Sequence, residues 1–306
     1  MRCSMHSHNH SHGHDRDKDS RIGWTFFLNV SFTIIEFIGG WLTNSTAIMA
    51  DAVHDLGDSI SIGFAWILSK FSEKKPSKKF SYGYRRLSLF GALINSIVLI
   101  VGSIWILFEA TPRLFNPQMP MVEGMFGLAI LGVAVNGYAV FKLKAGNTLN
   151  EKVLTWHLLE DVLGWVAVLI VSVVLFFVEL PILDPLLSIA FTLFILFNVI
   201  KNLKATLALF LQAVPDKDIR TEIEKTLTQL PEINGVHHIH FWSLDGESHV
   251  LTAHLELSQN FEVERLIQLK HTIASKLSIY GLSHTTIEFE FLNENCRDND
   301  EGQEDN

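Results

Sequence analysis

The chain is divided by its pattern of apolar and polar residues. It is polar up to about residue 21, mostly apolar from Ile22 to roughly Phe210, and polar again after that. The apolar part contains six segments, each with about the 20 residues that a helix needs to cross a bilayer. The pattern predicts an α-helical membrane protein with six transmembrane helices, near residues 22–42, 47–69, 87–108, 122–141, 153–178 and 182–204.

The connections between these segments differ in their basic residues. The first, third and fifth connections contain only Arg113 between them, whereas the N-terminal tail and the fourth connection are basic. The second connection is the richest, with Lys70, Lys74, Lys75, Lys78, Lys79, Arg85 and Arg86. Because cytoplasmic loops carry an excess of Lys and Arg, we expect both termini to lie in the cytoplasm.

The polar C-terminal part shows helix and strand periodicities in the order αββαβ. Asp216 is a suitable cap for a first helix, and a second helix is expected near 261–278. Strands are expected at 236–243, 249–257 and 285–292, where apolar and polar residues alternate. Two helices on one face of a small sheet form a ferredoxin-like arrangement. The expected domains are a His-rich cytoplasmic tail (1–20), a transmembrane domain (21–210), a cytoplasmic metal-binding and dimerisation domain (211–293) and an acidic disordered tail (294–306).

Charge and cysteine content exclude several classes of function. The 24 Lys and Arg residues against 33 Asp and Glu residues give a net charge of −9, which argues against a nucleic-acid partner because phosphate binding needs a basic surface. The two cysteines, Cys3 and Cys296, lie in polar tails at opposite ends of the chain. They predict neither a disulfide framework nor a thiolate metal cluster.

The most informative residues are polar ones inside the apolar segments. The second segment contains His54 and Asp58, and the fifth contains His157 and Asp161. Residues four apart lie on one face of a helix, so two such helices facing each other offer two imidazoles and two carboxylates. This is a closed tetrahedral set of the kind that Zn²⁺ prefers. Asp51, Asp55 and Glu160 flank the two pairs and either form an entry path, face water or cap neighbouring helices.

The charges of this set suggest an exchange of ions. Two carboxylates, two neutral imidazoles and Zn²⁺ sum to zero, as do two carboxylates and two protonated imidazoles without the metal. Since zinc binding displaces protons from histidine, exchange of Zn²⁺ for protons leaves no net charge in the membrane. The pattern therefore indicates a proton-coupled antiporter, with protons as the counter-ion.

Histidines also gather outside the apolar segments. If Ile239 and Phe241 pack inward, strand alternation places a metal-binding set on the polar face of the sheet, namely His238, His240, His254, Glu288 and Glu290. In the N-terminal tail, His6, His8, His10, His12 and His14 recur at every second position, which is typical of a disordered metal-gathering tract.

On these motifs the chain resembles the cation diffusion facilitator family, in its zinc-exporter branch. The likeness covers about residues 20–292 and is strongest in the segments 44–58, 80–84, 156–164, 235–243 and 253–255. It implies that His54, Asp58, His157 and Asp161 are the ligands of transported zinc. It also implies a homodimer that alternates between inward- and outward-facing states, and soluble domains that dimerise and bind structural or regulatory zinc.

The resemblance further implies His237, His254 and Glu290 as cytoplasmic ligands, in partial conflict with the alternation, which favours His238 or His240. The connection between spans two and three lacks His and Asp, so we expect no metal site there. Cys296 stands alone where vesicular members have Cys-x-x-Cys, and the loop between spans four and five is short, which favours a bacterial inner-membrane protein.

Three other interpretations remain. The exported ion could be Cd²⁺, Co²⁺, Ni²⁺ or Fe²⁺ instead of Zn²⁺. An intramembrane zinc enzyme would need three protein ligands and an open position for water, whereas four ligands are available here, so we expect no enzyme. A membrane-bound zinc sensor would need an output domain, and the sequence supplies none.

Overall fold

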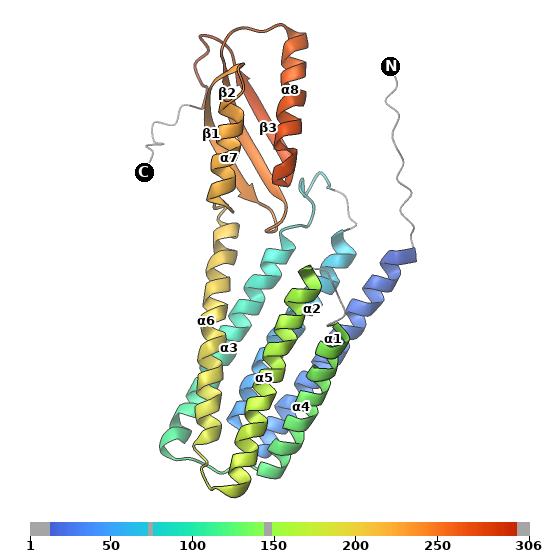
Figure 1. Ribbon diagram of the computed structural model, residues 1–306, viewed down its shortest axis with the longest axis vertical. Coiled ribbons are helices and arrows are strands. Elements are labelled where there is room, and N and C mark those ends of the chain that lie inside the picture. The colour runs from blue at the N-terminus through green and yellow to red at the C-terminus, as the bar shows by residue number, and fades with distance from the viewer. Residues whose placement is uncertain (1–12, 73–75, 144–148, 299–306) are drawn as a thin grey trace. The chain divides into compact units, whose positions relative to one another are not determined.

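The protein is described by a computed structural model that covers residues 13–72, 76–143 and 149–298, without the side chains of 13–22, 69–70, 72, 142–143 and 149–157. The chain divides into two compact units, one that contains most of residues 1–204 and one that contains residues 205–306. The elements of both are labelled in Figure 1.

The first unit contains six long helices (Figure 1): α1 (Gly13–Thr43), α2 (Thr46–Ser72), α3 (Leu87–Phe115), α4 (Val122–Leu143), α5 (Leu149–Phe177) and α6 (Leu183–Phe210). In the described part of the chain, all except α2 are long and apolar enough to cross a membrane on composition alone. Helix α2 has the length, at 27 residues, but carries Asp51, Asp55 and Asp58. The helix that falls short on hydropathy is therefore the one that carries half of the expected transport ligands.

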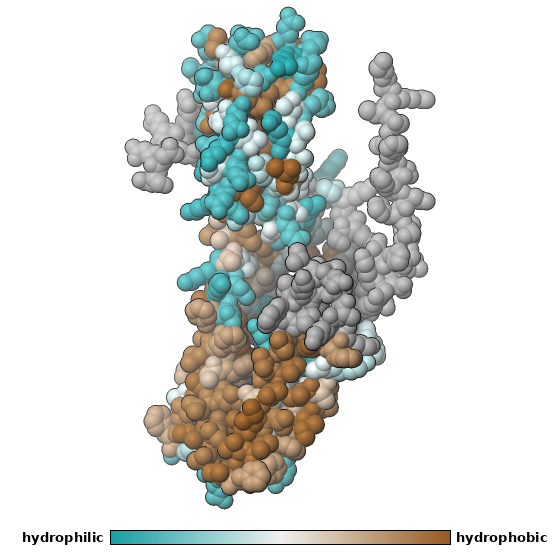
Figure 2. Space-filling model, in the orientation of Figure 1, coloured by the Kyte–Doolittle hydropathy of each residue, from teal (hydrophilic) through white to brown (hydrophobic). Residues whose placement is uncertain are grey.

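The helices pack through small residues and a few apolar clusters. Helix α1 lies along α2, and α4 lies along α5. At Gly132 in α4, an added Cβ atom would lie 2.1 Å from the indole of Trp165 in α5, so only glycine permits this approach. Val53 of α2, Leu99 of α3 and Val199 of α6 belong to one buried cluster. The coloured face of the unit in Figure 2 is predominantly apolar, as expected of a surface that contacts lipid.

The second unit has the expected αββαβ order, and the face of it that Figure 2 shows is largely hydrophilic. Its elements are α7 (Lys217–Thr228), β1 (Ile233–Ser243), β2 (His249–Leu257), α8 (Val263–Leu277), the short 3₁₀ helix η1 (Ser278–Tyr280) and β3 (Leu282–Glu290). Asp216 accepts hydrogen bonds from the amides of Asp218 and Ile219, which confirms the predicted helix cap.

The sheet has the strand order β1-β2-β3. Strand β1 pairs with β2 in antiparallel orientation, and β2 pairs with β3 in parallel orientation. Both helices contribute to one core with the sheet: Ile223 and Leu227 from α7, and Leu269, Ile273 and Leu277 from α8, are all buried in it. The helices therefore cover one face, and the other face of the sheet is left for polar residues.

One strand irregularity changes the expected alternation. In β1, His237 pairs with His254 and His240 pairs with Thr252, so two residues of β1 face one residue of β2. This is a β-bulge, and His238 within it has a φ of 48°, in the left-handed region. The prediction that β1 alternates regularly through His238 is therefore wrong. The bulge brings His237 to the same face as His240, His254 and Glu288.

Candidate metal sites

Three of the four residues expected to hold transported metal lie together inside the helical unit. The Nε2 atom of His54 lies 3.9 Å from Oδ2 of Asp58, one turn further along α2, and 3.5 Å from Oδ1 of Asp161 in α5. The three side chains can present ligand atoms within 4.8 Å of one another. The side chain of His157, the fourth expected ligand, lies outside the described residues. Because Asp161 is on α5 and His54 on α2, the cluster joins two separate helices.

Further carboxyl groups are buried near this cluster. Asp51 and Asp55 in α2 and Glu36 in α1 are 3%, 6% and 1% exposed, respectively. Asn29 of α1 donates hydrogen bonds to Ser59 Oγ (3.1 Å) and to the Asp55 carbonyl (3.4 Å) of α2, and it thereby links the two helices. Buried carboxyl groups at membrane depth are costly unless they are protonated or paired with a cation, so this part of the bundle favours positively charged occupants.

The start of α2 is held by a residue that the sequence analysis did not identify. Asp184 at the start of α6 accepts hydrogen bonds from Ser45 Oγ (2.5 Å), the Thr46 amide (2.7 Å) and Thr46 Oγ1 (2.8 Å). Ser188 Oγ donates to the Thr46 carbonyl (2.9 Å). Asp184 is thus an N-cap supplied by another helix, and its charge complements the helix dipole. It fixes the end of α2 that leads to His54. An Asp just inside the sixth apolar segment was the signal available in the sequence.

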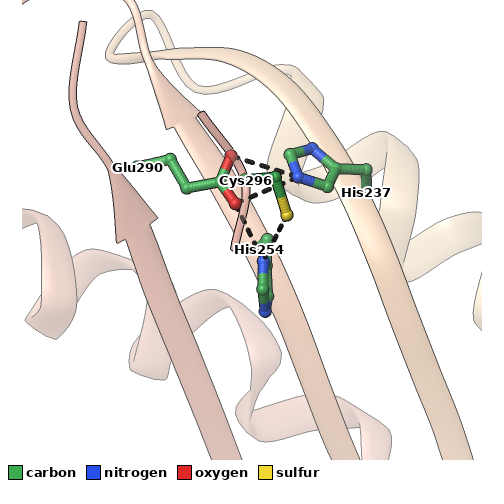
Figure 3. A group of neighbouring side chains, drawn as sticks. All are labelled: His237, His254, Glu290 and Cys296. Atoms are coloured by element: carbon green, nitrogen blue, oxygen red, sulfur yellow. Dashed lines mark hydrogen bonds and ion pairs between the residues drawn. The ribbon is translucent and has the colours of Figure 1, made fainter. Parts of the chain in front are cut away.

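A second cluster lies on the polar face of the sheet in the C-terminal unit (Figure 3). It contains His237 of β1, His254 of β2, Glu290 of β3 and Cys296, whose ligand atoms lie within 4.8 Å of one another. Oε1 of Glu290 lies 2.8 Å from Nδ1 of His254 and 3.1 Å from Nε2 of His237. The Sγ atom of Cys296 lies 3.5 Å from Nδ1 of His254. The structure thus places Cys296 beside three possible metal ligands, while Cys3 lies outside the described residues.

Carboxylates behind the cluster orient its two imidazoles. Nδ1 of His237 faces Glu256 Oε1 at 3.4 Å, and Nε2 of His254 lies 3.8 Å from Glu288 Oε2. Each ring therefore turns one nitrogen to an outer carboxylate and the other to the cluster, the arrangement that metal-ligating histidines adopt. Burial raises the pKa of Glu290, but hydrogen bonds from Cys296 and His254, with the charge of His237, outweigh it and hold that pKa below its usual value.

His240 and His238 occupy different places from the four clustered residues. His240 is exposed and pairs with Thr252, further along the same face. Both histidines line a neighbouring surface cavity of about 610 Å³, together with Glu288, Arg297 and Asp298. The His238 ring nevertheless lies 5.1 Å from the His254 ring, centroid to centroid. The structure therefore brings His237, His254 and Glu290 together and leaves His240 outside the group.

The fold and the two clusters define a multi-pass membrane protein that handles metal cations. The chain belongs to the cation efflux family: residues 24–211 match the cation efflux transmembrane domain, and residues 215–291 match the cation efflux protein cytoplasmic domain. Members of this family move metal cations across a membrane and are transporters, not enzymes.

Bacterial transporters are among the relatives of this chain. It is 31% identical to the zinc transporter ZitB of Escherichia coli (strain K12), over 89% of this chain and 87% of that protein. It is 30% identical to the cadmium, cobalt and zinc/H(+)-K(+) antiporter of Bacillus subtilis (strain 168), over 87% of each chain. The metal cation efflux system protein CzcD of Cupriavidus metallidurans is 31% identical over 86% of this chain and 84% of its own length.

Proposed function

We propose that this protein exports Zn²⁺ from the cytoplasm in exchange for protons, through a tetrahedral site made of His54, Asp58, His157 and Asp161. The observation that carries this proposal is the position of His54, which lies between the carboxylates of its own helix and of α5. The likeness to the ZitB zinc transporters supports zinc as the substrate, and the Bacillus relative supports a proton-coupled antiporter.

The chemistry of the site accounts for the coupling. An imidazole that accepts Zn²⁺ must be neutral, so zinc entry releases the protons that the histidines otherwise carry. With two carboxylates in the set, the zinc-loaded and doubly protonated forms have the same net charge. Neither form then leaves uncompensated charge in the low-dielectric membrane interior, and the protein can reorient with either load. Partly protonated forms without zinc carry net charge and are disfavoured.

The remaining parts of the chain fit this role. The protein lies in a bacterial inner membrane, with both termini on the cytoplasmic side. Two chains form a homodimer through their C-terminal domains. The His-rich N-terminal tract gathers zinc near the cytoplasmic entrance. His237, His254 and Glu290, with His240 nearby, hold a resident zinc ion. Their nitrogen and carboxylate donors suit Zn²⁺, and the ion would supply rigidity to the sheet face rather than act in transport.

The proposal is tested with purified protein in proteoliposomes that contain a pH-sensitive dye. We expect zinc added outside to enter vesicles and to drive proton movement in the opposite direction, and we expect both fluxes to vanish together in Asp161→Ala protein. Asp218→Ala, which removes an exposed carboxylate on α7, is the matched control and should leave both fluxes intact. Zinc flux without any proton movement would refute the exchange.

A second substrate is favoured by the relatives. The names of the Bacillus and Cupriavidus proteins include cadmium, cobalt or metal cations in general, and Cd²⁺ accepts the same imidazole and carboxylate donors as Zn²⁺. The same vesicles measure this directly. If Cd²⁺ or Co²⁺ drives a larger proton flux than Zn²⁺ at equal free concentration, zinc is not the preferred substrate.

A further inference from the structure

Cys296 is the residue in the cytoplasmic cluster that neither the proposed transport cycle nor the expected ligand set uses. Its Sγ atom lies 3.5 Å from Nδ1 of His254. Ligand atoms around a tetrahedral zinc ion, at bond lengths of about 2.0–2.3 Å, are separated by about 3.3–3.8 Å. The sulfur is therefore already at the separation that two ligands of one ion require, without any movement of the strand that carries His254.

The segment after β3 is shaped to deliver this sulfur. The amide of Phe291 donates to Oε2 of Glu294, and the amide of Glu294 donates to the carbonyl of Phe291, each at 2.9 Å, which closes a turn. Asn293 within the turn has a φ of 67°, a left-handed conformation that Asn tolerates. Beyond Cys296, Nη2 of Arg297 donates to Glu288 Oε2 at 2.7 Å. Residues 294–298, expected to belong to a disordered tail, thus fold back onto the sheet.

The cluster needs one more donor to be complete. His237, His254 and Glu290 provide three ligands from three strands, and outer carboxylates already orient both rings. A structural zinc site has four protein ligands, whereas three would leave an open position for water. In the described part of the chain, Cys296 is the residue grouped with these three. Two neutral imidazoles, a carboxylate and a thiolate also neutralise a divalent ion completely.

We propose that Cys296 is the fourth ligand of this cytoplasmic site, which thereby becomes a closed His₂-Glu-Cys site for a borderline-soft or soft divalent ion, Zn²⁺ or Cd²⁺. The inference rests on the proposed cytoplasmic zinc site and deepens it. Binding breaks the S–H bond, releases that proton to solvent and forms a sulfur–metal bond, with no oxidation. The thiolate sets this site apart from the transport cluster, whose expected ligands are nitrogen and oxygen only, because sulfur favours Zn²⁺ and Cd²⁺ over harder ions.

The test uses the full chain in detergent with Cys3→Ser, which leaves Cys296 as the only thiol because the sequence has two cysteines. Cd²⁺ titration should produce one thiolate-to-cadmium ultraviolet charge-transfer band per chain. His254→Ala in this background should weaken the affinity read from the band by about tenfold or more. His271→Ala, which removes an exposed histidine of α8, is the matched control and should leave the band unchanged. A band of unchanged affinity in His254→Ala would show that the thiol binds metal outside the cluster and would overturn the proposal.

A second measurement needs no variant within the cluster. Alkylation of Cys296 by iodoacetamide in the Cys3→Ser protein should slow about tenfold or more when Zn²⁺ is added, because a zinc-bound thiolate is held and shielded. An unchanged rate at saturating Zn²⁺ would overturn the proposal. The two hypotheses fail separately. Loss of protection with intact zinc flux in proteoliposomes removes Cys296 from the site and leaves the transport function. Protection without zinc flux supports the Cys296 site and refutes the transport proposal.

Discussion

The two metal-ligand clusters differ in how they are built and in how tightly their atoms are spaced. The intramembrane cluster takes side chains from two helices, and its nitrogen–oxygen distances are 3.5 and 3.9 Å. The cytoplasmic cluster takes side chains from three strands and a returning segment, with distances of 2.8–3.5 Å and carboxylates behind both histidines. A set held by three strands, with carboxylates that orient both histidines, suits a resident ion, whereas a set shared between two helices suits an ion that must leave when the helices move.

The largest expected effect breaks the intramembrane cluster. Asp58→Ala and Asp161→Ala should each abolish zinc transport, because each removes one ligand and leaves a positive excess when zinc is present. The dimer should stay folded, and the cytoplasmic site should still bind zinc. Flux in proteoliposomes measures the loss of transport, and size-exclusion chromatography checks that the dimer stays folded. Normal zinc flux in either variant would remove this cluster from the transport path.

A selectivity change is expected when one donor type replaces another. His54→Asp should raise the ratio of Cd²⁺ or Mn²⁺ to Zn²⁺ transport, because an imidazole favours zinc and an added carboxylate relaxes that preference. The ratio is measured by competition between the metals in one vesicle preparation. An unchanged ratio with intact flux would show that His54 does not set selectivity.

The next largest effect is expected from the carboxylates that orient the histidines of the cytoplasmic cluster. Glu256→Gln should weaken zinc binding at the cytoplasmic site by about 10- to 100-fold, because Glu256 orients His237 through its outer nitrogen. The measurement is zinc titration calorimetry in an Asp161→Ala background, which silences the transport site. Glu247→Gln, on the exposed turn between β1 and β2, is the control. Equal affinity in both variants would show that His237 needs no such support.

The anchor of α2 is expected to have a smaller effect. Asp184→Ala removes the acceptor at the helix start and should lower stability by about 0.5–2 kcal/mol, with reduced zinc flux because α2 carries His54 and Asp58. Asp184→Asn keeps one carbonyl acceptor and should therefore retain part of the stability and part of the zinc flux. Thermal unfolding in detergent and vesicle flux are compared across the three proteins. If Asp184→Ala matches the wild-type protein in both assays, α6 does not anchor α2.

The smallest effect concerns the N-terminal histidines. Deletion of residues 1–16 should lower the rate at scarce zinc but leave the rate at saturating zinc unchanged, because a tethered tract only raises the local metal concentration. Transport is compared with the full-length protein across a zinc series. Complete loss of transport at saturating zinc would mean that the tail contains an obligatory ligand.

Periodicity determined much of this protein from the sequence alone. Six apolar segments became six helices, because a chain in lipid must satisfy its backbone hydrogen bonds within each segment. The αββαβ order followed from alternation and capping at Asp216, both of which are local signals. The pairing of His54 with Asp58 also came from local spacing, since residues four apart share a helix face.

The tertiary structure decided what local spacing could not. The alignment of Asp161 with His54 depends on how α5 meets α2, and the capping of α2 by Asp184 joins residues 138 positions apart. In the sheet, one bulged residue at His238 reversed the alternation and brought His237 to the polar face. Cys296 joined the cluster only because a turn after β3 folds the chain back onto the sheet. These features depend on contacts between distant segments, which periodicity along a single strand or helix does not encode.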